Sequence, residues 1–94
     1  MEIRYSSHLL SRLALRHIPK AMPRTIYLRA QRHFLDTHLL VEIAVHEVRL
    51  SGKKRHVALA YKRYPAHTVL ITIHPLKPQQ LANRIRSGRW RSLS

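Results

Sequence analysis

The chain has 94 residues, of which 45% are hydrophobic and 23% are charged, a mixture typical of one globular domain spanning residues 1–94. It has 18 Lys and Arg residues but only four Asp and Glu residues, which gives a net charge of +14, and it has no cysteine. This composition excludes a disulfide framework and a thiolate metal site, and four scattered acids argue against a two-metal nuclease.

The excess of positive charge predicts a polyanionic partner, with RNA or DNA as the first expectation. Most of the cations are arginines, whose guanidinium groups bind phosphate oxygens in a bidentate manner. A basic surface that is neutralised by an acidic protein is the alternative. No apolar run approaches the roughly 18 residues of a membrane helix, so we expect a cytoplasmic protein without a membrane partner.

The first third of the chain has the pattern of two helices. Ser6 or Ser7 can cap the first helix, and Pro19 ends it. A second helix is expected over residues 20–31. Apolar residues at helical spacing supply the inner faces of the two helices: Leu9, Leu10, Leu13, Ala14 and Ile18 in the first, and Ile26, Tyr27, Ala30 and Phe34 in the second.

From residue 39 onward, the pattern favours strands over 39–50, 55–62 and 68–74, with a hairpin turn over 51–54. In the last strand, strict alternation places Val69, Ile71 and Ile73 on one face and Thr68, Leu70, Thr72 and His74 on the other. Pro75 is expected to stop this strand, and Pro78 to begin a short helix over 79–87.

This order of elements predicts an α+β fold. Two N-terminal helices should pack on one face of a three- to four-stranded antiparallel sheet, with a short C-terminal helix. The second face of the sheet should be open, so that its polar residues could meet a ligand.

A candidate ligand-binding ridge lies on the first helix, where His8, Arg12 and Arg16 are spaced by four residues and share one flank. Two arginines at this spacing repel one another, and a bound anion would reverse the sign of that interaction. The alternative is an ordinary solvated basic face.

Candidate acid–base residues lie on the strands. Thr72 and His74 share a face, and Glu42 and His46 lie at matching parity on the long strand if no bulge intervenes. Histidine can act as acid or base near neutral pH, although His74 could instead simply hydrogen-bond a loop carbonyl. Cations for phosphate binding follow the hairpin turn and occupy the C-terminal segment: Lys54, Arg55, Arg84 and Arg86.

Trp90 lies among the C-terminal arginines, where it could stack on a base or belong to the core. The eight histidines do not have the spacing of a helical zinc site, so we expect no metal and no cofactor. Nucleic-acid cleavage would then use the RNA 2′-hydroxyl to attack the adjacent phosphate, with histidine as acid or base and cations at the phosphorane.

Two segments carry a family resemblance. One is Tyr5-Ser6-Ser7-His8 with Arg12, Arg16 and Ile18-Pro19, and the other combines residues 70–77 with residues 83–90. Together they resemble the RelE-like and BrnT-like small proteins of bacteria and archaea, over roughly residues 4–90. The resemblance implies a RelE-like, microbial-ribonuclease-like fold and a metal-independent endoribonuclease toxin of a toxin–antitoxin pair.

The resemblance applies best to His8, Arg12, Arg16, His74 and Arg84. His74 is the expected base or acid, and His46 or His8 is the complementary group. The implied partners are RNA, including mRNA on the ribosome, and a small acidic antitoxin; self-association is a further expectation. Two alternatives remain, namely a non-catalytic RNA- or DNA-binding module and an inhibitor of gyrase with the same fold.

Overall fold

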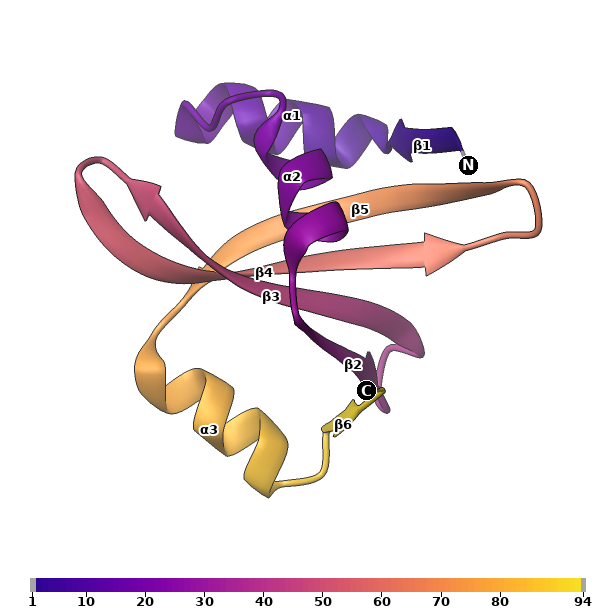
Figure 1. Ribbon diagram of the computed structural model, residues 1–94, viewed down its shortest axis with the longest axis vertical. Helices are drawn as coiled ribbons and strands as arrows, with labels where there is room; N and C mark the ends of the chain where they lie inside the picture. The colour runs from indigo at the N-terminus through magenta and orange to yellow at the C-terminus, as the bar shows by residue number, and fades with distance from the viewer. Residues whose placement is uncertain (1, 94) are drawn as a thin grey trace.

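The computed structural model describes residues 2–93 and has an α+β architecture, in which three helices accompany one six-stranded mixed sheet (Figure 1). The strand order is β1-β5-β4-β3-β2-β6; β1 is parallel to β5, and all other neighbours are antiparallel. The α+β class is therefore confirmed, but the sheet is larger than the expected three or four strands and is not purely antiparallel. None of the helices within residues 2–93 is long and apolar enough to cross a membrane.

The elements follow one another along the chain as β1 (Glu2–Tyr5), α1 (Ser7–Arg16), α2 (Met22–Arg29), β2 (Arg32–Asp36), β3 (Val41–Leu50), β4 (Lys53–Arg63), β5 (His67–Leu76), α3 (Pro78–Arg86) and β6 (Trp90–Ser92).

Helix α1 begins where its capping signal predicts, and the same residue fixes the helix to the sheet. The Ser6 hydroxyl accepts a hydrogen bond from the Leu9 amide at 3.0 Å, which makes Ser6 the N-cap. The hydroxyl also donates to the Ile71 carbonyl at 2.7 Å, while the Ser6 amide donates to the Leu70 carbonyl. The start of α1 is thereby fastened to the middle of β5.

The predicted second helix is too long at its C-terminal end. Helix α2 ends at Arg29, and residues 32–36 form β2, which pairs with β3 on one side and β6 on the other. Phe34 is buried, as expected, but it lies on this strand rather than on a helix. The predicted element for Phe34 is wrong because five residues are too few to distinguish the two-residue repeat of a strand from the repeat of a helix.

The hairpin between β3 and β4 is tighter than predicted. Ser51 (φ 50°) and Gly52 (φ 78°) both adopt positive φ, as a two-residue type I′ turn requires. Lys53 and Lys54 already belong to β4.

Strand β5 departs from strict alternation at a bulge. Tyr61 of β4 pairs with Leu70 and Ala60 pairs with Thr72, so Ile71 is left without a partner in the register. Leu70 therefore shares a face with Ile73 instead of opposing it, which corrects the predicted division of this strand.

Pro75 does not stop β5, which continues to Leu76. Because β1 pairs only as far as Leu70, the second half of β5 lies at the edge of the sheet, where proline is tolerated. Helix α1 follows this half of the strand in Figure 1.

Both faces of the sheet are covered, so the expected open face is absent from the described part of the chain. The core beneath α1 and α2 consists of Leu9, Leu13, Ile18, Ile26, Ala44, Val57, Leu59, Tyr61, Leu70 and Ile73. The core on the α3 side consists of Phe34, Ile43, Val45, Ala58, Ala60, Leu76, Leu81 and Trp90. Trp90 is 3% exposed and is a core residue.

Candidate nucleic-acid interface

The candidate site is centred on His74, which lies on β5 opposite Ala58 and on the α3 side of the sheet. The ring is half-buried. Burial lowers the pKa of His74, and the positive charges of Arg84, Arg16 and Arg12 lower the pKa further. His74 is therefore mainly neutral at pH 7, which is the form that can accept a proton.

The three arginines around His74 come from two helices that are far apart in the sequence. Arg12 and Arg16 belong to α1 and Arg84 to α3; Arg12 and Arg84 are half-buried, whereas Arg16 is exposed. The three ion pairs found within residues 2–93 use other arginines: Arg4 with Glu2, Arg63 with Glu42, and Arg89 with Asp36. The charges that surround His74 thus remain available to an anion.

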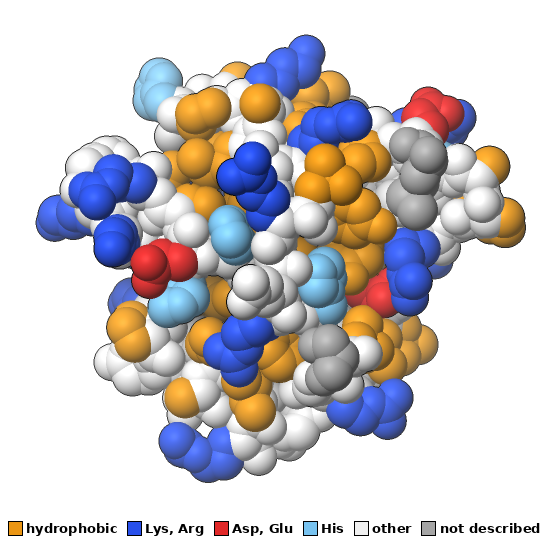
Figure 2. All heavy atoms as spheres, in the orientation of Figure 1, with side chains coloured by type: hydrophobic (Ala, Val, Ile, Leu, Met, Phe, Trp, Pro, Cys, Tyr) orange, Lys and Arg blue, Asp and Glu red, His pale blue; other side chains and the backbone are white. Residues whose placement is uncertain are grey.

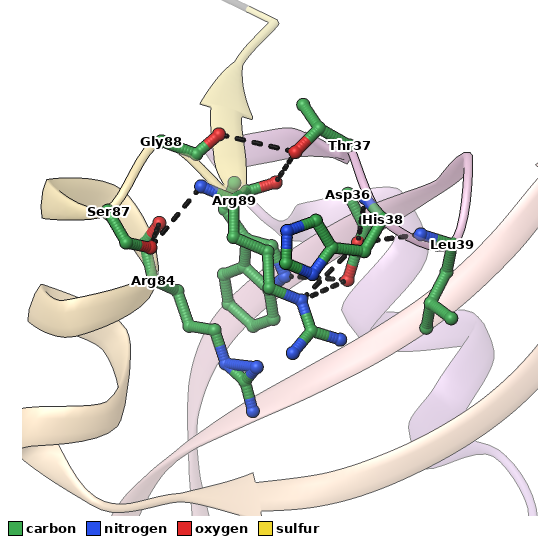
Figure 3. A network of polar contacts seen from close by, with 9 residues as sticks. Asp36, Thr37, His38, Leu39, Arg84, Ser87, Gly88 and Arg89 are labelled. Carbon is green, nitrogen blue, oxygen red and sulfur yellow. Dashed lines mark hydrogen bonds and ion pairs between the residues drawn. The ribbon is translucent and has the colours of Figure 1, made fainter.

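Arg84 is held in place by Trp90 and, through it, by a buried acid. The Arg84 guanidinium lies 5.6 Å from the centre of the Trp90 ring, a cation–π distance. The Trp90 indole donates a hydrogen bond to Asp36 at 3.0 Å, and Arg89 forms an ion pair with the same carboxylate (Figure 3). This network fixes the end of α3 relative to the β2–β3 turn.

Asp36 is almost fully buried yet remains an anion. Burial by itself would raise the pKa of Asp36, but hydrogen bonds from the Leu39 amide, the Trp90 indole and the His38 amide, with the charge of Arg89, bring the pKa below its usual value. Its role is to join the β2–β3 turn to β6.

The matching parity of the two strands predicted that His46 and His74 share a face of the sheet, and this is wrong. His46 pairs with Val57, and Val57 pairs with Pro75, whereas His74 pairs with Ala58. His46 therefore points to the α1 and α2 face and His74 to the α3 face.

Glu42 is also on the α1 and α2 face, where its carboxylate accepts two hydrogen bonds from Arg63 at 2.6 and 2.7 Å. Counted across the strand pairings, His46 is level with Val57 and then with Pro75, one residue beyond His74. Even-numbered residues of β3 and of this part of β5 therefore lie on opposite faces of the sheet.

The other sequence-predicted residues divide into two groups. Arg55 lies beside Arg16 in the lining of a cavity between the end of α1 and the β3–β4 hairpin. His8, Lys54 and Arg86 are exposed and lie outside the group of charges that acts on His74. His8 begins the same helical ridge, two turns before Arg16.

This cavity, which we call the hairpin cavity, has a volume of about 600 Å³. Arg49, Lys53 and His17 also line it and were missed in the sequence. A signal was present, because Lys53 directly follows the two-residue turn and Arg49 lies two residues before it, and a tight hairpin brings the ends of its two strands together.

A second polar cluster joins β2, β4 and α2. The His33 Nδ1 atom lies 2.7 Å from the Tyr61 hydroxyl, and the Tyr27 and Tyr61 rings pack edge to face at 4.8 Å. Burial and the nearby Glu42 and Tyr27 raise the pKa of Tyr61, so its hydroxyl stays protonated and donates to His33. The second His33 nitrogen, Nε2, then donates to the Ala30 carbonyl at 3.1 Å, so this histidine is fully engaged in the fold.

The molecule carries far more basic than acidic side chains, with 18 Lys and Arg against four Asp and Glu. Lys and Arg side chains spread across the face seen in Figure 2, and acidic side chains appear there only as small isolated groups. Within residues 2–93, no three His, Asp or Glu side chains gather in a way that could hold a metal ion.

Comparisons of the sequence and the structure with known proteins give no match to a family model, to a curated protein or to a solved structure. The function therefore has to be argued from the site itself.

Proposed function

We propose that the chain is a metal-independent endoribonuclease that resembles the RelE-like and BrnT-like toxins in fold and activity. The observation that carries this proposal is the position of His74, a half-buried histidine flanked by arginines from two different helices. Neutral histidine supplies a base, and fixed cations supply the charge that a phosphorane requires.

The proposed reaction is an intramolecular transesterification. His74 removes the proton from the RNA 2′-hydroxyl, whose oxygen then forms a bond to the adjacent phosphorus. The bond from phosphorus to the 5′-oxygen breaks, and a protonated histidine returns a proton to that oxygen. Arg12, Arg16 and Arg84 hold the phosphate oxygens as their charge increases.

His8 is the candidate donor of the second proton, because it begins the α1 ridge and is exposed. The products are a 2′,3′-cyclic phosphate and a free 5′-hydroxyl. DNA lacks the attacking hydroxyl, so the reaction selects RNA by its chemistry. In the cell, an acidic antitoxin is the partner that this basic surface fits.

A non-catalytic RNA-binding module is the second candidate. The observation that favours it is the location of His46 on the opposite face of the sheet, which leaves His74 without the second acid–base histidine expected on the strands. Such a module needs the same arginines but no acid–base pair.

The test is cleavage of a defined RNA in EDTA by the wild-type protein, His74→Ala and His74→Gln. We expect wild-type cleavage with 2′,3′-cyclic phosphate ends, and a loss of about 10²- to 10⁴-fold in both variants. His38→Ala is the matched control, because His38 is exposed on the β2–β3 turn and only its backbone amide is used by Asp36. Equal RNA binding by all four proteins without any cleavage would favour the binding module.

A further inference from the structure

We propose that the hairpin cavity binds one nucleotide of single-stranded RNA, with the phosphate on its cationic wall and the base on its apolar floor. This inference rests on the proposed RNA function and extends the site around His74 to a second subsite. Figure 1 shows the C-terminal end of α1 and the β3–β4 hairpin on the same side of the molecule, where the cavity lies.

The charge of the cavity is uncompensated. The lining of the cavity includes four cations and one histidine: Arg16, Arg49, Lys53, Arg55 and His17. None of the four acids of the chain lines the cavity. Two of these acids are paired with Arg4 and Arg63, and Asp36 is buried against Arg89. The cations repel one another in the free protein, so a bound anion turns a repulsive arrangement into an attractive one.

The hairpin brings three of these cations together on one short segment. Arg49 pairs with Lys54 across the two strands, and its guanidinium donates to the Gly52 carbonyl at 3.3 Å. Arg55 follows two residues after Lys53 on the same strand. A phosphate group in the cavity therefore meets several cationic donors at once.

The floor of the cavity shows that the ligand is more than an inorganic anion. It is formed by apolar residues of the α1–α2 connection, the start of α2 and strands β3 and β5: Ile18, Pro19, Met22, Leu50 and Pro75. A phosphate ion gains no favourable apolar contact from such a surface, whereas a nucleobase can pack its flat face against it. The volume of about 600 Å³ falls within the roughly 300–1,000 Å³ of small-molecule sites.

The cavity is connected to the candidate catalytic residue by two shared features. Arg16 lines the cavity and its charge also acts on His74. Pro75, in the floor, follows His74 on β5 and points to the opposite face of the sheet, so the two sites lie on either side of the same strand. A strand of RNA held at His74 can therefore place a neighbouring nucleotide in the cavity by passing Arg16 at the free edge of β5.

The binding test uses a 2′-O-methyl hexanucleotide, which cannot be cleaved by the proposed reaction. Arg49→Gln/Arg55→Gln is compared with Lys62→Gln/Arg91→Gln, which removes the same charge from exposed positions outside the cavity. We expect the cavity variant to bind about tenfold more weakly for each arginine removed, and the control to change affinity less than about twofold. Equal affinity of the two double variants would overturn the inference, even where the wild-type protein cleaves RNA.

A second measurement tests the floor. Methyl and ring NMR signals of Met22 and His17 are followed on addition of adenosine monophosphate and, separately, of inorganic phosphate. We expect both probes to shift His17 and only the nucleotide to shift Met22. A Met22 signal that is unmoved by the nucleotide would overturn the assignment of a base site.

The outcomes separate the two proposals. Loss of hexanucleotide binding in the cavity variant supports the subsite even if no RNA is cleaved by the wild-type protein. Tight hexanucleotide binding that depends on Lys62 and Arg91 instead, or preferential binding of an acidic peptide to the cavity, would overturn the subsite while leaving cleavage at His74 to be judged by its own assay.

Discussion

At the scale of single residues, the environment of His74 keeps the ring neutral and gathers positive charge around it. Burial and the neighbouring arginines both disfavour the imidazolium, so the pKa of His74 lies below its ordinary value. The rate of cleavage that requires neutral His74 should therefore rise as pH increases through this lowered pKa, at a lower pH than an ordinary histidine would require. The arginines that lower the pKa are the groups proposed to bind phosphate.

Replacing Arg84 by Gln should raise the pKa of His74, because the charge of Arg84 lowers this pKa more than the charge of Arg16 or Arg12 does. The pKa should stay below the ordinary histidine value, since burial is unchanged. NMR titration of the His74 ring measures it directly. Arg86→Gln is the control on the same helix; an identical titration midpoint in both variants would show that the Arg84 charge does not reach His74.

Part of this site could be predicted from the sequence. The four-residue spacing of Arg12 and Arg16 selects one helix flank, and His74 stands at the end of a strong strand pattern. The side of the sheet on which His46 lies could not be predicted. Alternation within β3 does not tell how β3 and β5 are each aligned with β4, which lies between them. The support of Arg84 by Trp90 and Asp36 joins residues more than 50 positions apart and leaves no local signal.

At the scale of elements, the three-residue strand β6 depends on Asp36. This carboxylate accepts hydrogen bonds from two turn amides and from Trp90, and it pairs with Arg89. So short a strand has few ladder hydrogen bonds of its own, and the buried acid supplies the missing attachment.

Asp36→Asn should lower the free energy of unfolding by about 2–3 kcal/mol at pH 7, because an amide accepts fewer hydrogen bonds and carries no charge for Arg89. The folded-state pKa of Asp36 is depressed, so its stabilisation is complete above the unfolded value of about 3.9 and is lost as pH falls through the folded value. The difference between the two proteins should therefore shrink below about pH 4.

Urea unfolding at several pH values checks this prediction. Glu47→Gln removes the same charge from an exposed position and serves as the control. A constant difference between wild type and Asp36→Asn from pH 7 to pH 3 would contradict it.

The long elements could be predicted and the short ones could not. A cap at Ser6 or Ser7 and a hairpin turn over residues 51–54 are local signals; the structure places the cap at Ser6 and narrows the turn to Ser51 and Gly52. The strands β1, β2 and β6 have three to five residues, too few for a period to be recognised. The bulge at Ile71 arises from pairing with β4, which no single segment encodes.

At the scale of the whole molecule, a net charge of +14 dominates the interactions with any polyanion. Only three arginines within residues 2–93 form ion pairs, so most of the positive charge is uncompensated. Binding of RNA should therefore be driven by the release of counterions and should weaken steeply with salt.

For single-stranded RNA, the slope of log K against log salt concentration should be about −4, at about −0.7 for each of six phosphate contacts. The six cations are Arg12, Arg16, Arg84, Arg49, Lys53 and Arg55. Arg16→Gln should make the slope shallower by about 0.7, whereas Arg91→Gln should leave it unchanged. Fluorescence anisotropy between 50 and 200 mM salt provides the measurement, and a wild-type slope near −1 would contradict a multi-contact track.

The parallel pairing of β1 with β5 has a consequence for synthesis. Strand β1 leaves the ribosome before its partner, which follows about 60 residues later and begins at His67. At roughly 5–20 residues per second, β1 and the start of α1 wait about 3–12 s for that partner. Since Arg12 and Arg16 reach His74 only after α1 is fastened to Leu70 and Ile71, a prematurely terminated chain carries the cations without the site. The proposed anion-binding arrangement is thus assembled only after β5 and α3 have been synthesised.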